Sequence, residues 1–164
     1  MTIMRVSLAG ASLSSEAKER LARRLIDAFA KVEVGNVSPE IRAGFVVRFE
    51  EVSPDDLYMG ERPMVEASEA RRAAIVSAHV MAGPWNAAMK ADLFARIEEA
   101  VRDVAGMPRP PGGADFWMTI VEVPEGAWGL GGRPVSIGSL APVFAPEQQA
   151  RIREQLAALT EGTA

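Results

Sequence analysis

Side chains able to do chemistry are few in this chain, and the first candidate is the start of the chain itself. Removal of Met1, which is usual before a small residue, would leave Thr2 with a free α-amine. Such an amine has a pKa near 7.7–8.0, so an apolar pocket would hold much of it in the neutral, basic form. A primary amine can also form an imine with a carbonyl compound. The alternative is that Thr2 is an ordinary strand residue without chemistry.

Other catalytic residue types are scarce. His79 is the only histidine, and the chain has no cysteine. A lone histidine supports no metal site, so we expect neither metal nor cofactor and interpret His79 as an interface residue. Without cysteine there is no thiolate nucleophile and no disulfide framework. Glu51 and Glu122 recur at equivalent places, which favours structural hydrogen bonds over catalysis.

These residues belong to a sequence that repeats itself. Residues 45–52 (FVVRFEEV) run on to 60–63 (GERP), and residues 116–123 (FWMTIVEV) run on to 131–134 (GGRP), 71 residues later and without a gap. A period of this length is too long for a solenoid unit and too short for a comfortable domain. The repeat therefore indicates two small modules that complete one core.

Each module is predicted to be a strand, a helix, a second strand and a glycine-containing turn. Ser14 and Asn86 stand at helix N-cap positions, and apolar residues follow them at helical spacing. A strand–helix–strand crossover makes two parallel, right-handed neighbours. The sequence thus predicts an α+β fold: tandem β-α-β modules form a four-stranded sheet with two helices on one face. The predicted strands are 2–8, 44–52, 73–80 and 115–123, and the predicted helices are 14–31 and 86–105.

The length of 164 residues fits a single domain. We divide residues 1–164 into a first module (2–63), a connector (64–72), a second module (73–138) and a C-terminal tail (139–164).

Segments outside the repeat have their own patterns. The charged, alanine-containing connector favours a short helix, whereas proline and glycine at 107–113 favour an extended loop. After Pro134 we expect a short strand at 135–137 and a helix from 146 to about 159. The tail has no counterpart in the first module, so we expect it to cover a sheet edge or to pack on a neighbouring subunit.

Composition argues against several classes of partner. A net charge of −4 gives no electrostatic case for binding nucleic acid or an anionic membrane. No apolar stretch approaches the roughly 20 residues that a membrane span needs, and the first residues lack the layout of a signal peptide. We therefore expect a cytoplasmic protein whose partner is a small molecule.

The turn that ends the second module carries a family resemblance. Residues 122–132 (EVPEGAWGLGG) leave a strand at Glu122 and continue into an aromatic-Gly-x-Gly-Gly turn, Trp128 to Gly132. Placed after duplicated β-α-β units, this turn resembles the tautomerase superfamily, with 4-oxalocrotonate tautomerase (4-OT) and fused, double-length relatives such as the cis-3-chloroacrylic acid dehalogenases. The first copy keeps only Gly60 of the turn. The resemblance covers residues 2 to about 138 and implies a tautomerase/MIF-like fold.

The resemblance also implies an assembly and a chemistry. Fused members form trimers, so we expect a homotrimer. Family chemistry uses an N-terminal proline as general base or acid, and arginines that hold substrate carboxylates. This chain departs from that pattern, because residue 2 is Thr and the arginine positions fall near Ala11 and on Val46 and Trp117.

The remaining candidates are placed by comparison with the family. Arg48 lies two residues beyond the family arginine position, so strand alternation puts it on the same face as a displaced carboxylate clamp; the alternative is a solvated or interface ion pair. Trp128 takes the aromatic wall position, or is a plain core aromatic. Arg133 has a twin in Arg62, which also fits a structural role. The expected site is Thr2 as the catalytic amine with Arg48, Trp117, Trp128 and Arg133 as substrate-binding residues.

Two functions are compatible with these residues. The first is a cofactor-free isomerase or lyase on a small carbonyl or unsaturated carboxylic acid, with the N-terminal amine in place of proline. The missing proline argues against standard tautomerase activity. The alternative is a catalytically silent small-molecule binding or assembly protein of the same fold.

Overall fold

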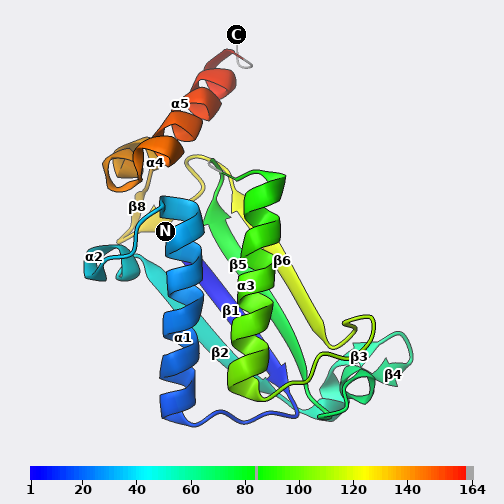
Figure 1. The fold of residues 1–164 in the computed structure, drawn as a ribbon. Coiled ribbons are helices and arrows are strands. Elements are labelled where there is room, and N and C mark those ends of the chain that lie inside the picture. Colours follow the sequence, from blue (N-terminus) through cyan, green and yellow to red (C-terminus); the bar gives the residue numbers. More distant parts are fainter. Residues whose placement is uncertain (84, 162–164) are drawn as a thin grey trace.

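The computed structural model describes residues 1–83 and 85–161. A four-stranded sheet in the order β2-β1-β5-β6 carries helices α1 and α3 side by side on one face (Figure 1). The predicted α+β architecture is confirmed. The strands are β1 (Thr2–Ala9), β2 (Phe45–Val52), β5 (Ala73–Met81) and β6 (Phe116–Val123), and the helices are α1 (Ser15–Phe29) and α3 (Ala87–Ala105).

The two modules have the same strand register. The strands within each module are parallel, with Thr2 opposite Phe45 in the first and Ala74 opposite Phe116 in the second. Ala74 follows Thr2 by 72 residues and Phe116 follows Phe45 by 71, so equivalent residues pair in both copies. The repeat in the sequence is therefore a repeat in the structure.

Antiparallel pairing of β1 with β5 joins the modules into one sheet. Arg5 lies opposite Ser77, which is 72 residues later and is its equivalent in the second module. A residue opposite its own equivalent marks an approximate twofold axis through the sheet. The first strand of each module therefore begins at the end of the sheet where the second strand of the other module finishes.

Both helices begin where the sequence predicts, and α3 also ends there, whereas α1 ends at Phe29, two residues before the predicted end. The Ser14 hydroxyl accepts a hydrogen bond from the Ala17 amide at 3.2 Å, and the Asn86 side chain accepts one from the Met89 amide at 2.9 Å, which satisfies donors that a helix start leaves free. Gly106, with φ of 63°, ends α3. The buried stripes are Leu21, Leu25 and Phe29 in α1 and Leu93, Ile97 and Val101 in α3.

The helix-facing side of the sheet makes the core. Met4, Val6, Val76 and Val80 are fully buried beneath the helices. Burial of one such side chain contributes about 1.5–3 kcal/mol, so this layer supplies a large part of the folding free energy.

The other side of the sheet has no cover within the chain. We call it the open face; it carries the alternate strand residues, including Ile3, Val46, Trp117 and Val121, which are between 43% and 54% exposed. The strands carry apolar residues on both sides of the sheet, but only those on one side are buried beneath the helices.

Short elements follow each module. Hairpin β3 (Tyr58–Met59) and β4 (Arg62–Pro63) repeats as hairpin β7 (Gly129–Leu130) and β8 (Arg133–Pro134). The strand predicted at 135–137 is wrong: pairing stops at Pro134, and the Ser136 hydroxyl accepts a hydrogen bond from the Gly138 amide to begin α4 (Ile137–Leu140). The other elements are α2 (Pro39–Arg42), α5 (Pro146–Glu161), a π-helical turn at Ala30–Val34 and 3-10 turns at Pro54–Asp56, Met64–Ala67 and Ala141–Val143.

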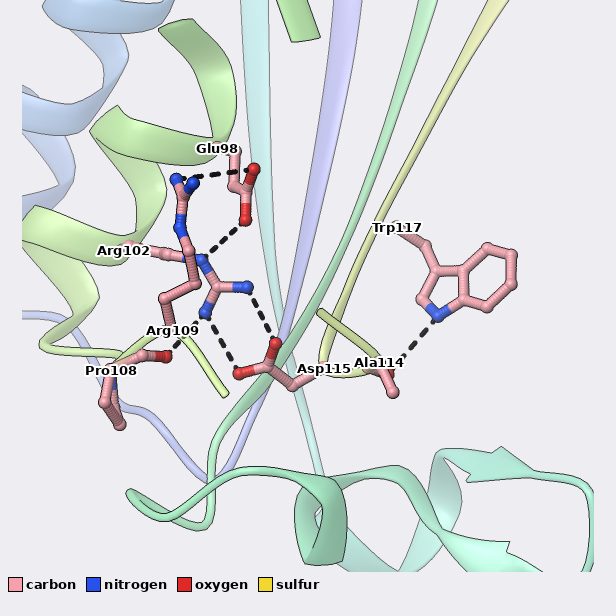
Figure 2. A network of polar contacts seen from close by, with 7 residues as sticks. All are labelled: Glu98, Arg102, Pro108, Arg109, Ala114, Asp115 and Trp117. Carbon is pink, nitrogen blue, oxygen red and sulfur yellow. Dashed lines mark hydrogen bonds and ion pairs between the residues drawn. The ribbon is translucent and has the colours of Figure 1, made fainter. Parts of the chain in front are cut away.

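A buried ion pair fastens the loop between α3 and β6 (Figure 2). Both carboxylate oxygens of Asp115 accept hydrogen bonds from the Arg102 guanidinium, at 2.7 and 3.1 Å. Arg102 also donates to the Pro108 carbonyl at 2.7 Å and to Glu98 at 2.8 Å. The loop at 107–113 forms no helix or strand, as predicted, and this pair fixes it to the helix.

We predict that Asp115→Asn destabilises the protein by about 3–5 kcal/mol, because it removes the fully buried counter-charge of the Arg102 guanidinium and leaves it with Glu98, which is more exposed. Urea unfolding would measure the loss. Asp92→Asn is the matched control, because it removes an exposed partner of Arg96 and should cost no more than about 0.5 kcal/mol. Equal losses in the two variants would contradict the assigned role of the buried pair.

Candidate functional site

A cavity of about 250 Å³ lies at the end of the sheet where β1 begins. Since β6 runs antiparallel to β1, the β7–β8 hairpin reaches the same end, beside the N-terminus (Figure 1). Glu40 contributes the only ionisable side chain among the lining residues. The apolar walls come from Met1, from Val34, Ile41 and Phe45 in the first module, from Leu130 and Val135 of the second, and from Leu140, Val143 and Phe144 of the tail.

The tail closes this cavity. The Ala145 amide donates a hydrogen bond to the Val34 carbonyl at 2.8 Å, and Phe144 and Ile152 are buried. Gly35 permits the close approach, because a Cβ atom there would lie 2.7 Å from the Cβ of Ala145. The tail therefore packs on the first module of its own chain.

Thr2 is next to the cavity and is fully buried. Its amide donates to the carbonyl of Gly44, a cavity residue, at 3.4 Å. Its hydroxyl donates a hydrogen bond to the Glu33 carboxylate at 2.8 Å. Residue 2 is thus held between the cavity on one side and a buried acid on the other.

Glu33 is buried because α1 continues into a π-helical turn, Ala30–Val34. The Gly35 amide closes this turn on the Ala30 carbonyl at 3.1 Å, and the wider turn directs Val32, Glu33 and Val34 inward together. Burial raises the pKa of the Glu33 carboxyl above its ordinary value of 4.5. The charge of the N-terminal amine and the hydrogen bond from the Thr2 hydroxyl lower this pKa, but their effect is smaller than that of burial.

The equivalent end of the sheet is built differently. Ala73, at the start of β5, packs with Met64 and Val65 of the connector and with Ala9 in a separate buried cluster. The chain passes through this position instead of ending there. The two ends of the sheet therefore differ, since one is filled by a packed cluster and the other has a cavity.

Two predicted site residues lie away from the cavity. Arg48 is on the open face, where its guanidinium contacts Glu50 at 3.1 Å, while the Thr2 side chain faces the helix layer. Trp117 is also on the open face, at the start of β6 and so at the opposite end of the sheet from Thr2. Within one chain neither is brought together with Thr2.

The other two predicted site residues, Trp128 and Arg133, lie at the end of the sheet that carries the cavity. Trp128 is half-buried against the core, its carbonyl accepts a hydrogen bond from the amide of the cavity residue Val135 at 2.8 Å, and its indole N–H has no partner among the described residues. Arg133 is exposed on β8 and pairs with Leu130, as its twin Arg62 pairs with Met59.

Glu51 and Glu122 make the structural hydrogen bonds that their recurrence predicted. Glu51 accepts a hydrogen bond from Lys18 at 2.7 Å, and Glu122 accepts one from Lys90 at 2.5 Å. His79 is exposed on the open face. Within residues 1–83 and 85–161 there is no cluster of three His, Asp or Glu residues arranged to hold a metal ion. Of the helices described, none is long and apolar enough to cross a membrane.

Sequence reasoning missed Glu33, although a signal was present. Leu21, Leu25 and Phe29 form the buried stripe of α1 at four-residue spacing, and Glu33 is the next position. A carboxylate that continues an apolar stripe, between Val32 and Val34, indicates a buried acid in need of a partner. For Glu40 and for the tail residues that line the cavity, the sequence shows no comparable pattern that would have predicted their place in the site.

No family model matches the chain, and no curated protein matches it in sequence. Solved structures do match. A wild-type fused 4-OT, solved as an asymmetric trimer, is 19% identical, with 84% of this chain and 98% of that chain covered and a TM-score of 0.63.

Two further structures cover similar shares. Pt0534, inactivated by 2-oxo-3-pentynoate, is 16% identical over 84% of this chain and 98% of its own, with a TM-score of 0.61. A macrophage migration inhibitory factor-like protein from Entamoeba histolytica is 13% identical over 82% and 98%, also with a TM-score of 0.61. The chain therefore has the tautomerase-superfamily fold in its fused, double form, as the resemblance predicted.

We predict that Gly35→Ala loosens the tail. Both Gly35 and Gly60 have positive φ, at 79° and 62°, but only Gly35 is crowded, so Gly60→Ala is the matched control. At positive φ an alanine lowers the free energy of unfolding by about 1–2 kcal/mol in both variants, and the crowding of its Cβ atom should lower it by a further ~1–3 kcal/mol at Gly35. Urea unfolding would give the difference, and faster tryptic cleavage after Arg151 would locate it. Indistinguishable variants would contradict the tail contact.

Proposed function

We propose that this protein is a cofactor-free isomerase or lyase that acts on a small carbonyl compound, with the α-amine of Thr2 as general base after removal of Met1. One observation carries the proposal: Met1 is part of the wall of the 250 Å³ cavity, and Thr2, the next residue in the chain, is fully buried. Removal of Met1 would therefore enlarge the cavity toward the new amine.

The surroundings suit an amine base. The cavity is predominantly apolar, and desolvation favours the neutral amine. A neutral amine can remove a proton from the carbon beside a carbonyl group and return it to another carbon, which completes an isomerisation.

The cavity also favours one class of substrate. No Arg or Lys is among its lining residues, while Glu40 is one of them and Glu33 lies behind it. A carboxylate substrate would meet negative charge without a clamp, and a neutral carbonyl compound would not. Of the two classes predicted from the sequence, the small carbonyl is supported better.

A catalytically silent binding or assembly protein is the second candidate. Thr2 is fully buried, and Arg48 and Trp117 do not reach the cavity within one chain. A protein that kept the fold and lost the chemistry would show these features.

Blocking the amine tests the first candidate. Intact mass first establishes that Thr2 is the N-terminal residue. Carbamylation near neutral pH, which favours the α-amine over the more basic lysines, should lower the isomerisation rate of an aryl methyl ketone enol by about 100-fold or more, since general bases contribute 10²–10⁴-fold. Thr2→Ala keeps the amine and should keep most of the rate.

The control is the same assay with the matched aryl pyruvate, which should react more slowly because it carries a carboxylate. Undiminished turnover after carbamylation would exclude the amine as the base. Binding of the ketone without turnover in any preparation would favour the silent binding protein.

We also propose that the chain forms a homotrimer through the open face. The exposed apolar residues of that face need a cover, and the fused 4-OT matched above is a trimer. The first-module half of the face carries a charged group, in which Glu50 contacts Arg5 at 3.4 Å and Arg48 at 3.1 Å, whereas the open-face positions of β5 and β6 carry no Arg, Lys, Asp or Glu. A subunit interface of more than about 1,000 Å² is expected.

We predict that Trp117→Asp dissociates the assembly, because it puts a charge on the apolar surface that the interface would bury. Light scattering should give about three chains per particle for the wild type and one for the variant, at micromolar concentration. Phe94→Asp is the control: Phe94 is 37% exposed on α3, in the helix layer, and its replacement should leave the mass unchanged. A monomeric wild type would refute the trimer.

A further inference from the structure

We infer that Glu33 is a positioning residue for the N-terminal amine: its carboxylate, held on the Thr2 hydroxyl, sets the pH at which that amine gives up its proton. The inference rests on the proposed function, because it concerns the amine proposed there as the base.

The contact between the two residues is direct. The Thr2 hydroxyl donates to the Glu33 carboxylate at 2.8 Å, and both residues are shielded from solvent. The Thr2 nitrogen is separated from that hydroxyl only by Cα and Cβ, so a free amine at this position lies close to the same carboxylate. Glu33 already interacts with the positive charge of the N-terminus while Met1 is present.

A buried acid at this position has no evident packing purpose. An apolar residue would complete the stripe of Leu21, Leu25 and Phe29, whereas a buried carboxylate without a partner costs several kcal/mol. Asp115, which is equally buried, has the Arg102 guanidinium as its counter-charge. For Glu33 no ion pair with an Arg, a Lys or the N-terminus occurs among the described residues, and the charge of the N-terminal amine acts on it from a longer distance.

Other charged groups around Glu33 are few. On the turn itself Lys31 is exposed, and on α2 Glu40 lines the cavity and accepts a hydrogen bond from Ser38 at 2.7 Å. From α5 the neutral Gln148 approaches Gly35, and on β5 the residue opposite Thr2 is the apolar Val80. Among the described residues that line the cavity, Glu40 is therefore the one further acid that could act on the amine.

The consequence is a coupled pair. A neighbouring carboxylate favours the ammonium form, so the amine and the Glu33 carboxyl titrate together. Glu33 thereby lets the amine hold a proton removed from one carbon until another carbon takes it. Without Glu33, only the desolvation by the apolar cavity would act on the amine, and the amine would lose its proton at lower pH.

The test measures the amine without turnover. Trace acetic anhydride is applied to the whole protein over a range of pH, and acetylation of the N-terminal peptide is read by mass spectrometry. The midpoint should fall by about one pH unit or more in Glu33→Gln. In Glu40→Gln, which removes the same charge from the cavity wall without touching Thr2, the fall should be much smaller.

Equal midpoints in folded wild type and Glu33→Gln would overturn the inference. If Glu33→Gln does not fold, ¹³C NMR of the Glu33 carboxyl in the wild type decides: a second step where the amine titrates supports coupling, and a single step overturns it. A shifted midpoint without isomerase activity would refute the proposed function alone. A retained Met1 would refute both.

Discussion

Antiparallel pairing of β1 with β5 is the constraint on which the rest of the structure depends. It joins two modules that could not each bury a helix face alone, and its register places Arg5 opposite its own equivalent Ser77. The twofold arrangement follows, and with it the meeting of each module's first strand with the hairpin of the other. The N-terminus reaches the β7–β8 hairpin for this reason, although more than a hundred residues of sequence separate them.

The symmetry is broken at the two ends of the sheet. At one end the connector fills the space with Met64 and Val65; at the other the chain begins, and the tail closes over a cavity instead. The same fold thus provides a structural end and an end able to bind a small molecule. The difference comes from chain continuity and from the tail, since the strands themselves are equivalent.

Two buried acids show how burial and partnership separate structural from functional roles. Asp115 is paired with Arg102, whose guanidinium also binds the Pro108 carbonyl, so its charge is used to hold a loop. Within the described part of the chain the Glu33 carboxylate has only the Thr2 hydroxyl and the nearby N-terminus as partners, and burial raises the pKa of its carboxyl. A buried acid without a paired cation lowers the stability of the fold. Such acids occur at functional sites, so Glu33 is a candidate for a functional role, whereas Asp115 has a structural one.

The sequence by itself determined the modules, the strand and helix positions and the one-sided helix layer, because a repeat, two N-caps and helical spacing are local signals. It did not determine the end of β8, since strand pairing at Val135 depends on the neighbouring strand and not on propensity. Tertiary structure alone decided which candidates meet. It placed Arg48 and Trp117 on the open face, folded the tail over the first module, and set Glu33 against Thr2, 31 residues away. Contacts between segments distant in sequence leave no local pattern, because they are fixed by sheet register and by the packing of the whole chain.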